Sequence, residues 1–204
     1  MEPLFLEVVN WKERIFRWRL KRMQAPERER RGCSLNQAES VGLLYLERDH
    51  AHFREIKDLA KRIKEEYGVK RVGMMSFVQE EEKQTPNWLV KKLDSGYFCK
   101  SDLNWYGWPV KEFEAFTQTP FDILIDLELE PIMPLKFVVR SSCAGMKVGP
   151  DHPEWANDLD VRLVQEPEEI DDMEEVDLIL HDPMEAWREH TSRTLAFLNQ
   201  TQLQ

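Results

Sequence analysis

The feature that most constrains the fold is a strand, helix, strand order within residues 40–78. An apolar run, SVGLLYL at residues 40–46, is typical of a strand that is buried on both faces. Residues 51–67 then place apolar side chains at spacings of three and four, with Lys and Glu on the other side, which predicts an amphipathic helix. Gly68 is expected to end that helix, and residues 69–78 form a second apolar run. This order predicts two parallel strands joined by a right-handed crossover.

A second unit of the same kind lies further along the chain. FDILIDL at residues 121–127 predicts another buried strand, and a proline-containing turn follows it. Residues 135–144 predict a short helix that Gly145 ends, and MKVG at residues 146–149 predicts the returning strand. Two such units predict an α/β fold, as a single three-layer α/β/α domain with a mainly parallel sheet, flavodoxin-like or Rossmann-like.

The C-terminal helix has a strong start signal. Asp182, Pro183 and Glu185 fit the N-cap, N1 and N3 positions. The stripe expected to pack on the sheet comprises Trp187, Thr191, Thr194, Leu195 and Leu198. Two earlier runs, DLDVRLV at 158–164 and VDLIL at 176–180, both resemble strands. We expect the second run to be the core strand, because it leads directly into the helix, and the first to be an edge strand or an insertion.

Charge is unevenly distributed along the chain. The formal net charge is -10, yet residues 11–31 carry nine Lys or Arg against three acids, and residues 165–182 carry nine acids with no Lys or Arg. We therefore predict a basic amphipathic N-terminal helix or arm at residues 1–32. An α/β/α domain would follow at residues 33–204, with an acidic insertion at about 151–175.

The arm carries a broad apolar arc. On a helical wheel, one stripe comprises Val8, Trp11, Ile15 and Trp18, and a second comprises Val9, Phe16, Leu20 and Met23. Such an arc could dock on the protein's own sheet, lie on an anionic membrane surface, or place arginines along RNA phosphates. The side chains predicted to contact a partner are Trp11, Arg14, Arg17, Trp18 and Lys21, together with Trp105 and Trp108 of an aromatic loop. The loop aromatics would otherwise seal the sheet edge or the top of the core.

Features that common cofactors require are missing. After the first strand the chain reads ERDHAHF, where a phosphate-binding turn needs glycine, and Glu47 and Asp49 would repel phosphate. We expect Asp49 to cap the following helix, with its histidines exposed. Cys33, Cys99 and Cys143 form no CxxC motif and fit reduced thiols. We therefore expect no cofactor and no metal site.

The best position for a polar ligand is the carboxyl end of the second unit. GPDHPEWANDLD at residues 149–160 follows a strand, where open α/β sheets bind ligands. The predicted ligand-binding residues are Asp126, Asp151, His152 and Asp158. An ordinary solvated loop would have the same composition.

Several ordered motifs carry a resemblance to a known family. These are GYFCKSDLNWYGWP at 96–109, FDILIDL, PLKFVVRSSCAGMKVGP at 134–150, and VDLIL leading into DPMEAWREHTSRTLAFLN at 182–199. From about Val41 onward the chain resembles a family of small, uncharacterised bacterial α/β proteins, a likeness that implies a Rossmann-like fold and no assigned activity. FDILIDL and MKVG are also similar to elements of the N-terminal half of the glycosyltransferases that add heptose to lipopolysaccharide.

These features favour a non-catalytic cytoplasmic binding or scaffold protein. Its basic N-terminal helix would contact an anionic partner such as RNA, a ribonucleoprotein or a membrane surface. No apolar run reaches the ~20 residues that cross a bilayer, and the N-terminus lacks the order of a secretory signal. A peripheral membrane location remains open. The alternative is a degenerate glycosyltransferase-like or other enzyme domain that binds a small polar ligand.

Overall fold

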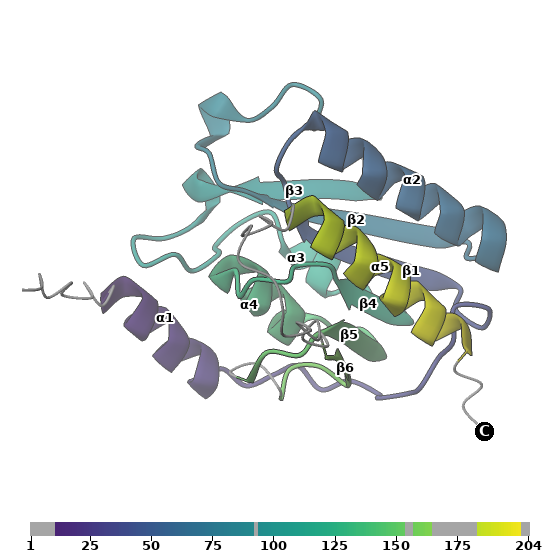
Figure 1. The fold of residues 1–204 in the computed structure, drawn as a ribbon. Helices are drawn as coiled ribbons and strands as arrows, with labels where there is room; N and C mark the ends of the chain where they lie inside the picture. The colour runs from purple at the N-terminus through teal and green to yellow at the C-terminus, as the bar shows by residue number, and fades with distance from the viewer. Residues whose placement is uncertain (1–10, 92–93, 154–156, 165–182, 201–204) are drawn as a thin grey trace, which may run out of the picture.

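A parallel sheet forms the centre of the molecule (Figure 1). The computed structural model describes residues 11–91, 94–153, 157–164 and 183–200. The strands are β1 (Ser40–Leu46), β2 (Arg71–Val78), β3 (Ser95–Cys99), β4 (Ile123–Asp126), β5 (Met146–Pro150) and β6 (Val161–Leu163). They form one six-stranded sheet in the order β3-β2-β1-β4-β5-β6, and every pair is parallel. This order is that of Rossmann folds, so the expected α/β class is confirmed.

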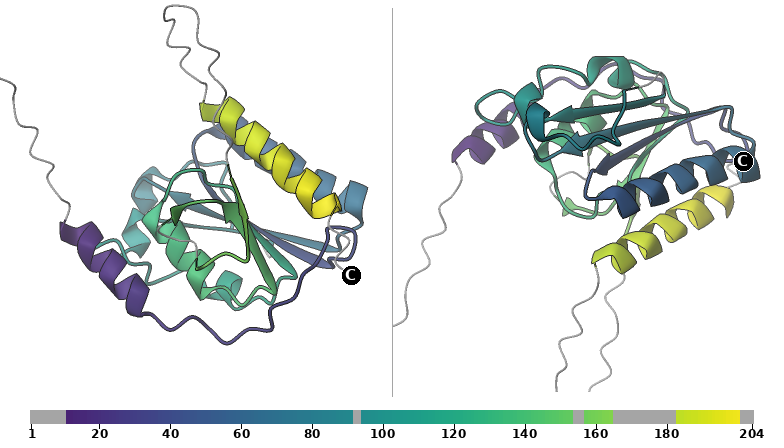
Figure 2. Two further views of the ribbon diagram at one scale, coloured as in Figure 1. Left: turned by 60° about the horizontal axis from the view of Figure 1, so that its bottom comes forward. Right: turned by 90° about the horizontal axis from the view of Figure 1, so that it is seen from above.

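Helices cover both faces of the sheet (Figure 2). They are α1 (Trp11–Arg22), α2 (His50–Tyr67), α3 (Glu114–Thr117), α4 (Met133–Ser141) and α5 (Pro183–Gln200), with short 3₁₀ turns η1 (Glu82–Gln84) and η2 (Lys100–Asp102). One apolar cluster joins α2 and α5 to the sheet, and a second joins α1, α3 and α4 to its other face. The three layers follow from this division of the core.

The first strand, helix, strand unit is confirmed. Asp49 caps α2 by accepting the His52 N–H at 2.8 Å, and Gly68 ends the helix in the left-handed conformation at φ 72°. Ile56 and Ile63 face the sheet and are fully buried. The expectation of exposed histidines is wrong for His52, which is buried against Trp187 with ring centroids 4.8 Å apart.

The second unit is confirmed with one correction. The helix α4 begins at Met133, with Pro134 in its first turn, and ends at Ser141, before the predicted end at residue 144. Ser142 already has extended backbone angles, so Gly145 does not end the helix. The Gly145 N–H instead donates to the Phe121 carbonyl at 2.8 Å, where the chain enters β5.

In the C-terminal region, the structure confirms the predicted edge strand and the predicted apolar stripe of the last helix. The expected edge strand in residues 158–164 is β6, which pairs with β5 at the sheet edge. The predicted core strand at 176–180 and the N-cap Asp182 lie outside the described residues. On α5, the predicted stripe of Trp187, Thr191, Thr194, Leu195 and Leu198 is buried throughout.

The basic helix α1 docks on the second face of the sheet. Phe16 and Leu20 are buried in the same cluster as residues of β1, β4 and α4. Phe16 lies 5.3 Å from the Trp108 ring between centroids. The Arg140 guanidinium holds the end of the helix by donating to the Met23 carbonyl at 2.9 and 3.2 Å. Of the three alternatives for the arm, α1 adopts docking on the protein's own sheet. The domain boundary predicted at residue 32 stays a prediction.

Substituting Phe16 tests this docking. Phe16→Ala should lower the free energy of unfolding by about 3 kcal/mol, because a fully buried ring is lost from the core. Trp18→Ala on the same helix should change it by less than about 0.5 kcal/mol, since Trp18 is 54% exposed. Urea unfolding followed by circular dichroism gives both values. Equal effects of the two substitutions would mean that α1 does not dock.

Candidate functional site

The first place to look for a ligand is the carboxyl end of the sheet between β1 and β4. The strand order reverses here, and open parallel sheets bind ligands at such switch points. Arg48 follows β1 and Glu128 follows β4, and their side chains form a two-pronged ion pair at 2.7 and 2.9 Å. Glu128 also accepts the Leu46 N–H at 3.0 Å and is fully buried. The position between β1 and β4 is thus occupied by the ion pair of Arg48 and Glu128.

Burial and the ion pair with Arg48 have opposite effects on the pKa of Glu128. Burial raises the pKa of the Glu128 carboxyl, and the Arg48 guanidinium acts in the opposite direction. Without Arg48, a buried carboxylate at this position would be strongly destabilising.

Asp126, a predicted ligand-binding residue, belongs to the same polar group. It is fully buried, and its Oδ2 lies 2.5 Å from the Lys136 Nζ of α4. Its Oδ1 accepts the Glu128 N–H at 3.2 Å. The Asp126 carboxylate therefore has an internal cation and a backbone donor as partners.

The other predicted ligand residues lie in the loop around β6. Asp151 pairs with Arg162 at 2.9 Å, and Asp158 pairs with Arg140 at 2.6 Å. His152 is half-buried, its Nδ1 has no hydrogen-bond partner, and burial lowers its pKa. Across residues 11–91, 94–153, 157–164 and 183–200, no three His, Cys, Asp or Glu side chains are grouped to hold a metal ion. The carboxylates of this loop thus contribute to ion pairs that fix the sheet edge.

Sequence reasoning missed two buried lysines. Lys136 lies in the run PLKFVVR, and Lys147 lies in MKVG. The Lys147 Nζ donates to the Val139 carbonyl at 2.6 Å, and burial lowers the pKa of Lys147 to about 8. A single cation within an apolar run was the available signal, because such a residue can be buried only with partners.

Glu47 is a third residue that was misjudged. It directly follows β1, is buried, and accepts the Trp88 indole N–H on Oε1 at 3.2 Å. Its Oε2 has no partner, and burial raises the pKa of Glu47 to about 7. The carboxyl is therefore partly protonated near neutral pH, whereas the sequence suggested a charge that would repel phosphate.

The second place to look is the outer side of α1, which we call the α1 surface: Trp11, Arg14, Trp18, Lys21, Arg22 and the adjoining Trp105. The residues of this surface that belong to α1 are spaced by three, four and seven positions, which places their side chains on the same side of the helix. Trp11 and Trp105 lie with ring centroids 5.4 Å apart and are 57% and 60% exposed. The guanidinium of Arg22 lies over the Trp18 ring at 4.3 Å. Exposed indole rings and cations thus alternate along the helix.

The loop at residues 104–109 holds this surface in place. Arg19 donates to the Tyr106 hydroxyl at 2.5 Å and lies over the Tyr106 and Trp108 rings. Trp108 is half-buried and packs on Phe137 at 4.6 Å between centroids, so it belongs mainly to the core. Arg17, another predicted contact residue, forms an ion pair with Glu13 at 2.6 Å.

The fold and these sites define a parallel α/β protein of Rossmann-like strand order. Residues 12–185 match the model of a family of unknown function (DUF6913), and this match covers most of the chain. The protein therefore belongs to that family. No curated protein and no solved structure matches the chain. The finer likeness to heptose-adding glycosyltransferases stays a prediction. In the part of the chain that the structure describes, no helix is both long and apolar enough for a membrane span.

The Asp126–Lys136 pair can be tested as a structural element. Lys136→Met should lower the free energy of unfolding by about 3 kcal/mol, because it leaves the Asp126 carboxylate buried without a cation. Adding Asp126→Asn should recover most of this loss, since the amide oxygen can still accept the Glu128 N–H. Urea unfolding of the single and double variants measures the effect. If the double variant is no more stable than Lys136→Met, the pair does not account for the loss.

Glu47 predicts a pH-dependent stability. Its pKa is about 7 when folded against 4.5 as the reference value, so the folded protein retains the Glu47 proton over that interval. The resulting stability is fully present below pH 4.5 and is lost as pH rises through 7, by up to about 3 kcal/mol. Glu47→Gln should remove this dependence and be the more stable form at about pH 8.

The difference between wild type and Glu47→Gln isolates this effect. The pKa values of His52 and His190 are lowered to about 4 by burial, and their contributions change in the opposite direction in an overlapping pH range. Those contributions cancel when the two proteins are compared at each pH by thermal unfolding. A constant difference across the range would contradict the assigned pKa of Glu47.

Proposed function

We propose that the protein is a non-catalytic binding protein whose α1 surface contacts single-stranded RNA. The observation that carries the proposal is the alternation of exposed indole rings and cations on the outer side of a helix that is fixed to the core. A ribonucleoprotein would offer the same chemistry through its RNA.

The way α1 docks supports RNA more than a membrane surface as the partner. Its apolar side chains Ile15, Phe16, Leu20 and Met23 pack toward the core. A helix that lies in a membrane interface needs a broad apolar face to insert among the lipids. The outward side of the described helix offers only Trp11 and Trp18 as large apolar groups, separated by cations. This pattern favours an aromatic and cationic contact with a polyanion.

Stacking and charge would act together on RNA. Stacking of a base on an aromatic side chain contributes about 1 to 3 kcal/mol and tolerates any base. Lys and Arg side chains that neutralise phosphates add a contribution that depends on salt. Trp11 and Trp105 are tilted by 36° to each other, so a base can stack on an outer ring face of either residue.

The interior of the fold supports a binding role more than a catalytic one. The pairs Arg48–Glu128 and Asp126–Lys136 lie where parallel α/β enzymes bind substrates, and both pairs are hydrogen-bonded within the chain. A ligand there would have to displace buried ion pairs, which is costly.

Point substitutions on the α1 surface test the proposal. Trp11→Ala and Trp105→Ala should each weaken binding of a labelled oligouridine of about 12 nucleotides by roughly tenfold, measured by fluorescence anisotropy. Deletion of residues 1–31 is a poor substitute, because it also removes Phe16 and Leu20 from the core.

Charge variants provide the control. Arg14→Gln combined with Lys21→Gln should weaken binding and make its salt dependence shallower, by about 0.7 in the logarithmic slope for each lost phosphate contact. Lys61→Gln combined with Lys64→Gln makes the same charge change on the exposed side of α2 and should have little effect. Equal effects of the two pairs would reject the α1 surface as the contact. Binding to phosphatidylserine vesicles in place of RNA would reject RNA as the partner.

A further inference from the structure

A buried acid is attached to the segment that follows β2, residues 79–91, which we call the 79–91 loop. Glu47 directly follows β1 and is 6% exposed. Its Oε1 accepts the Trp88 indole N–H of this loop at 3.2 Å, whereas its Oε2 is buried without a hydrogen-bond partner. One side chain of the loop is therefore bound to a carboxyl group that is cut off from water.

The two ends of the 79–91 loop are held by neighbouring segments. Near its start, the Glu82 N–H donates to the Ser101 hydroxyl of η2 at 3.0 Å. At its end, Lys91 forms an ion pair with Glu112 at 2.7 Å. Residues 85–90 lie between these contacts, so they can move while both ends stay in place.

Residues 85–90 have few contacts with the core. Leu89 is the only buried residue among them, and Trp88 is half-buried. The His50 ring lies 5.1 Å from the Trp88 ring between centroids. Segments with so few buried contacts open at a low free energy. The hydrogen bond between Trp88 and Glu47 therefore has a large influence on how often this segment opens.

The surroundings of Glu47 disfavour a negative charge. In the described part of the chain, no cation forms an ion pair with it, because Arg48 pairs with Glu128 instead. Asp49 at the N-cap of α2 and Glu80 after β2 both add repulsion. The titratable and charged groups around Glu47 are Tyr45, Arg48, Asp49, His50, His52 and Glu80.

We propose that residues 85–90 form a pH-dependent flap, which moves away from the core more often when Glu47 loses its proton. Protonated Glu47 carries no charge and can stay buried beside Trp88. Ionised Glu47 would hold a full charge with one hydrogen-bond donor and no cation, which is costly in a buried position. Moving Trp88 and Leu89 aside gives the carboxylate access to water. The closed flap remains the major form, because opening also exposes these two apolar side chains.

The size of the effect follows from the protons that the two forms bind. The pKa of Glu47 is about 7 with the flap closed, and it returns to the reference value of 4.5 when the carboxyl is hydrated. The closed form therefore binds more protons and is favoured at low pH. The ratio of open to closed flap should rise about tenfold between pH 6 and pH 8.

Ionisation of Glu47 under a closed flap is the competing explanation. It would change the overall stability of the protein with pH and leave the opening of residues 85–90 unchanged. A measurement on the flap itself distinguishes the two explanations.

The test is hydrogen exchange of the ¹⁵N-labelled full-length protein, followed by NMR between pH 6 and pH 8. The probes are the Leu89 amide, which donates to the Pro86 carbonyl at 3.1 Å, and the Trp88 indole N–H. After correction for the intrinsic exchange rate, the open fraction at both probes should rise about tenfold. The Gly107 amide, which donates to the Asn104 carbonyl at 2.9 Å in another loop, should show no such rise.

Two variants complete the test. Glu47→Gln should remove the rise, because its amide oxygen can still accept the Trp88 indole N–H but cannot ionise. Any contribution of His50 is the same in both proteins and cancels in the comparison with wild type. Glu82→Gln is the matched control, since Glu82 is an exposed acid of the same loop, and it should retain the tenfold rise.

Two outcomes would overturn the proposal. The first is an open fraction at Leu89 and Trp88 that stays constant from pH 6 to pH 8 in the wild type, which would mean that Glu47 ionises under a closed flap. The second is an equal rise in Glu47→Gln, which would assign the effect to another group. None of these measurements involves RNA, so the flap and the function proposed for the α1 surface stand or fail separately.

Discussion

A parallel sheet buried on both faces must be covered on both faces, and this requirement determines how the molecule is built. On one face, α2 and α5 supply 18 residues each and cover the central strands. On the other face, α4 has nine residues and α3 only four. The helix α1 therefore completes this second layer with Phe16 and Leu20, assisted by the aromatic loop at 104–109. The segment for which the sequence left docking as one of three alternatives is thus part of the core.

Buried charge is the second constraint, and it concentrates at the carboxyl end of the sheet. Asp126, Glu128 and Lys136 are almost entirely removed from solvent, and each has a partner of opposite charge within the chain. Such pairs contribute little net stability compared with apolar residues, yet losing one partner is costly. They fix how β4 meets β1, through Glu128, and how β4 meets α4, through Asp126. The same arrangement fills the position where many Rossmann-like proteins hold a cofactor.

Local patterns predicted the units of the fold, and contacts distant in sequence determined the sites. The strands β1, β2, β4 and β5 and the helix α2 follow from apolar periodicity and from Gly68, all of which are local signals. The contact of Trp11 with Trp105 joins residues far apart in the chain, and periodicity carries no information about it. The burial of His52 and the early end of α4 also depend on packing partners from other elements. Lys136 was visible in sequence, but its partner Asp126 could be chosen only when α4 was placed over β4.

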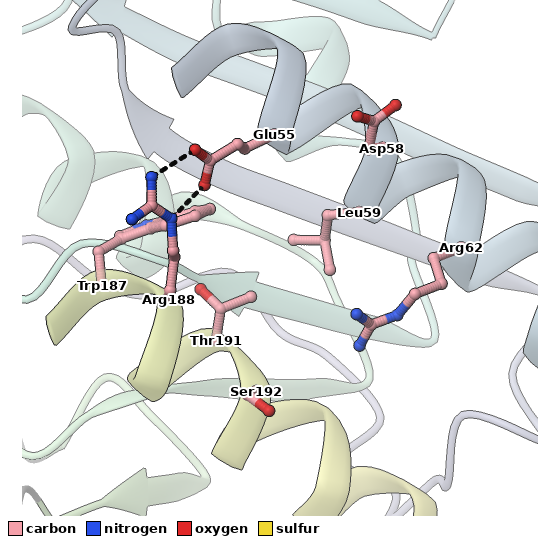
Figure 3. A pocket seen from close by; sticks show the side chains of 8 residues that line it. All are labelled: Glu55, Asp58, Leu59, Arg62, Trp187, Arg188, Thr191 and Ser192. Atoms are coloured by element: carbon pink, nitrogen blue, oxygen red, sulfur yellow. Dashed lines mark hydrogen bonds and ion pairs between the residues drawn. The ribbon is translucent and has the colours of Figure 1, made fainter. Parts of the chain in front are cut away.

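The two faces of α1 connect this architecture with function. An amphipathic helix can use its apolar side once, either for the core or for a membrane, and here Phe16 and Leu20 place it in the core. Trp11 and Trp18 then remain outside, 57% and 54% exposed. In the proposed function, these two exposed rings stack on bases while the neighbouring cations contact phosphates. The groove between α2 and α5, where Arg188 pairs with Glu55 (Figure 3), lies on the opposite layer and shares no residue with the α1 surface.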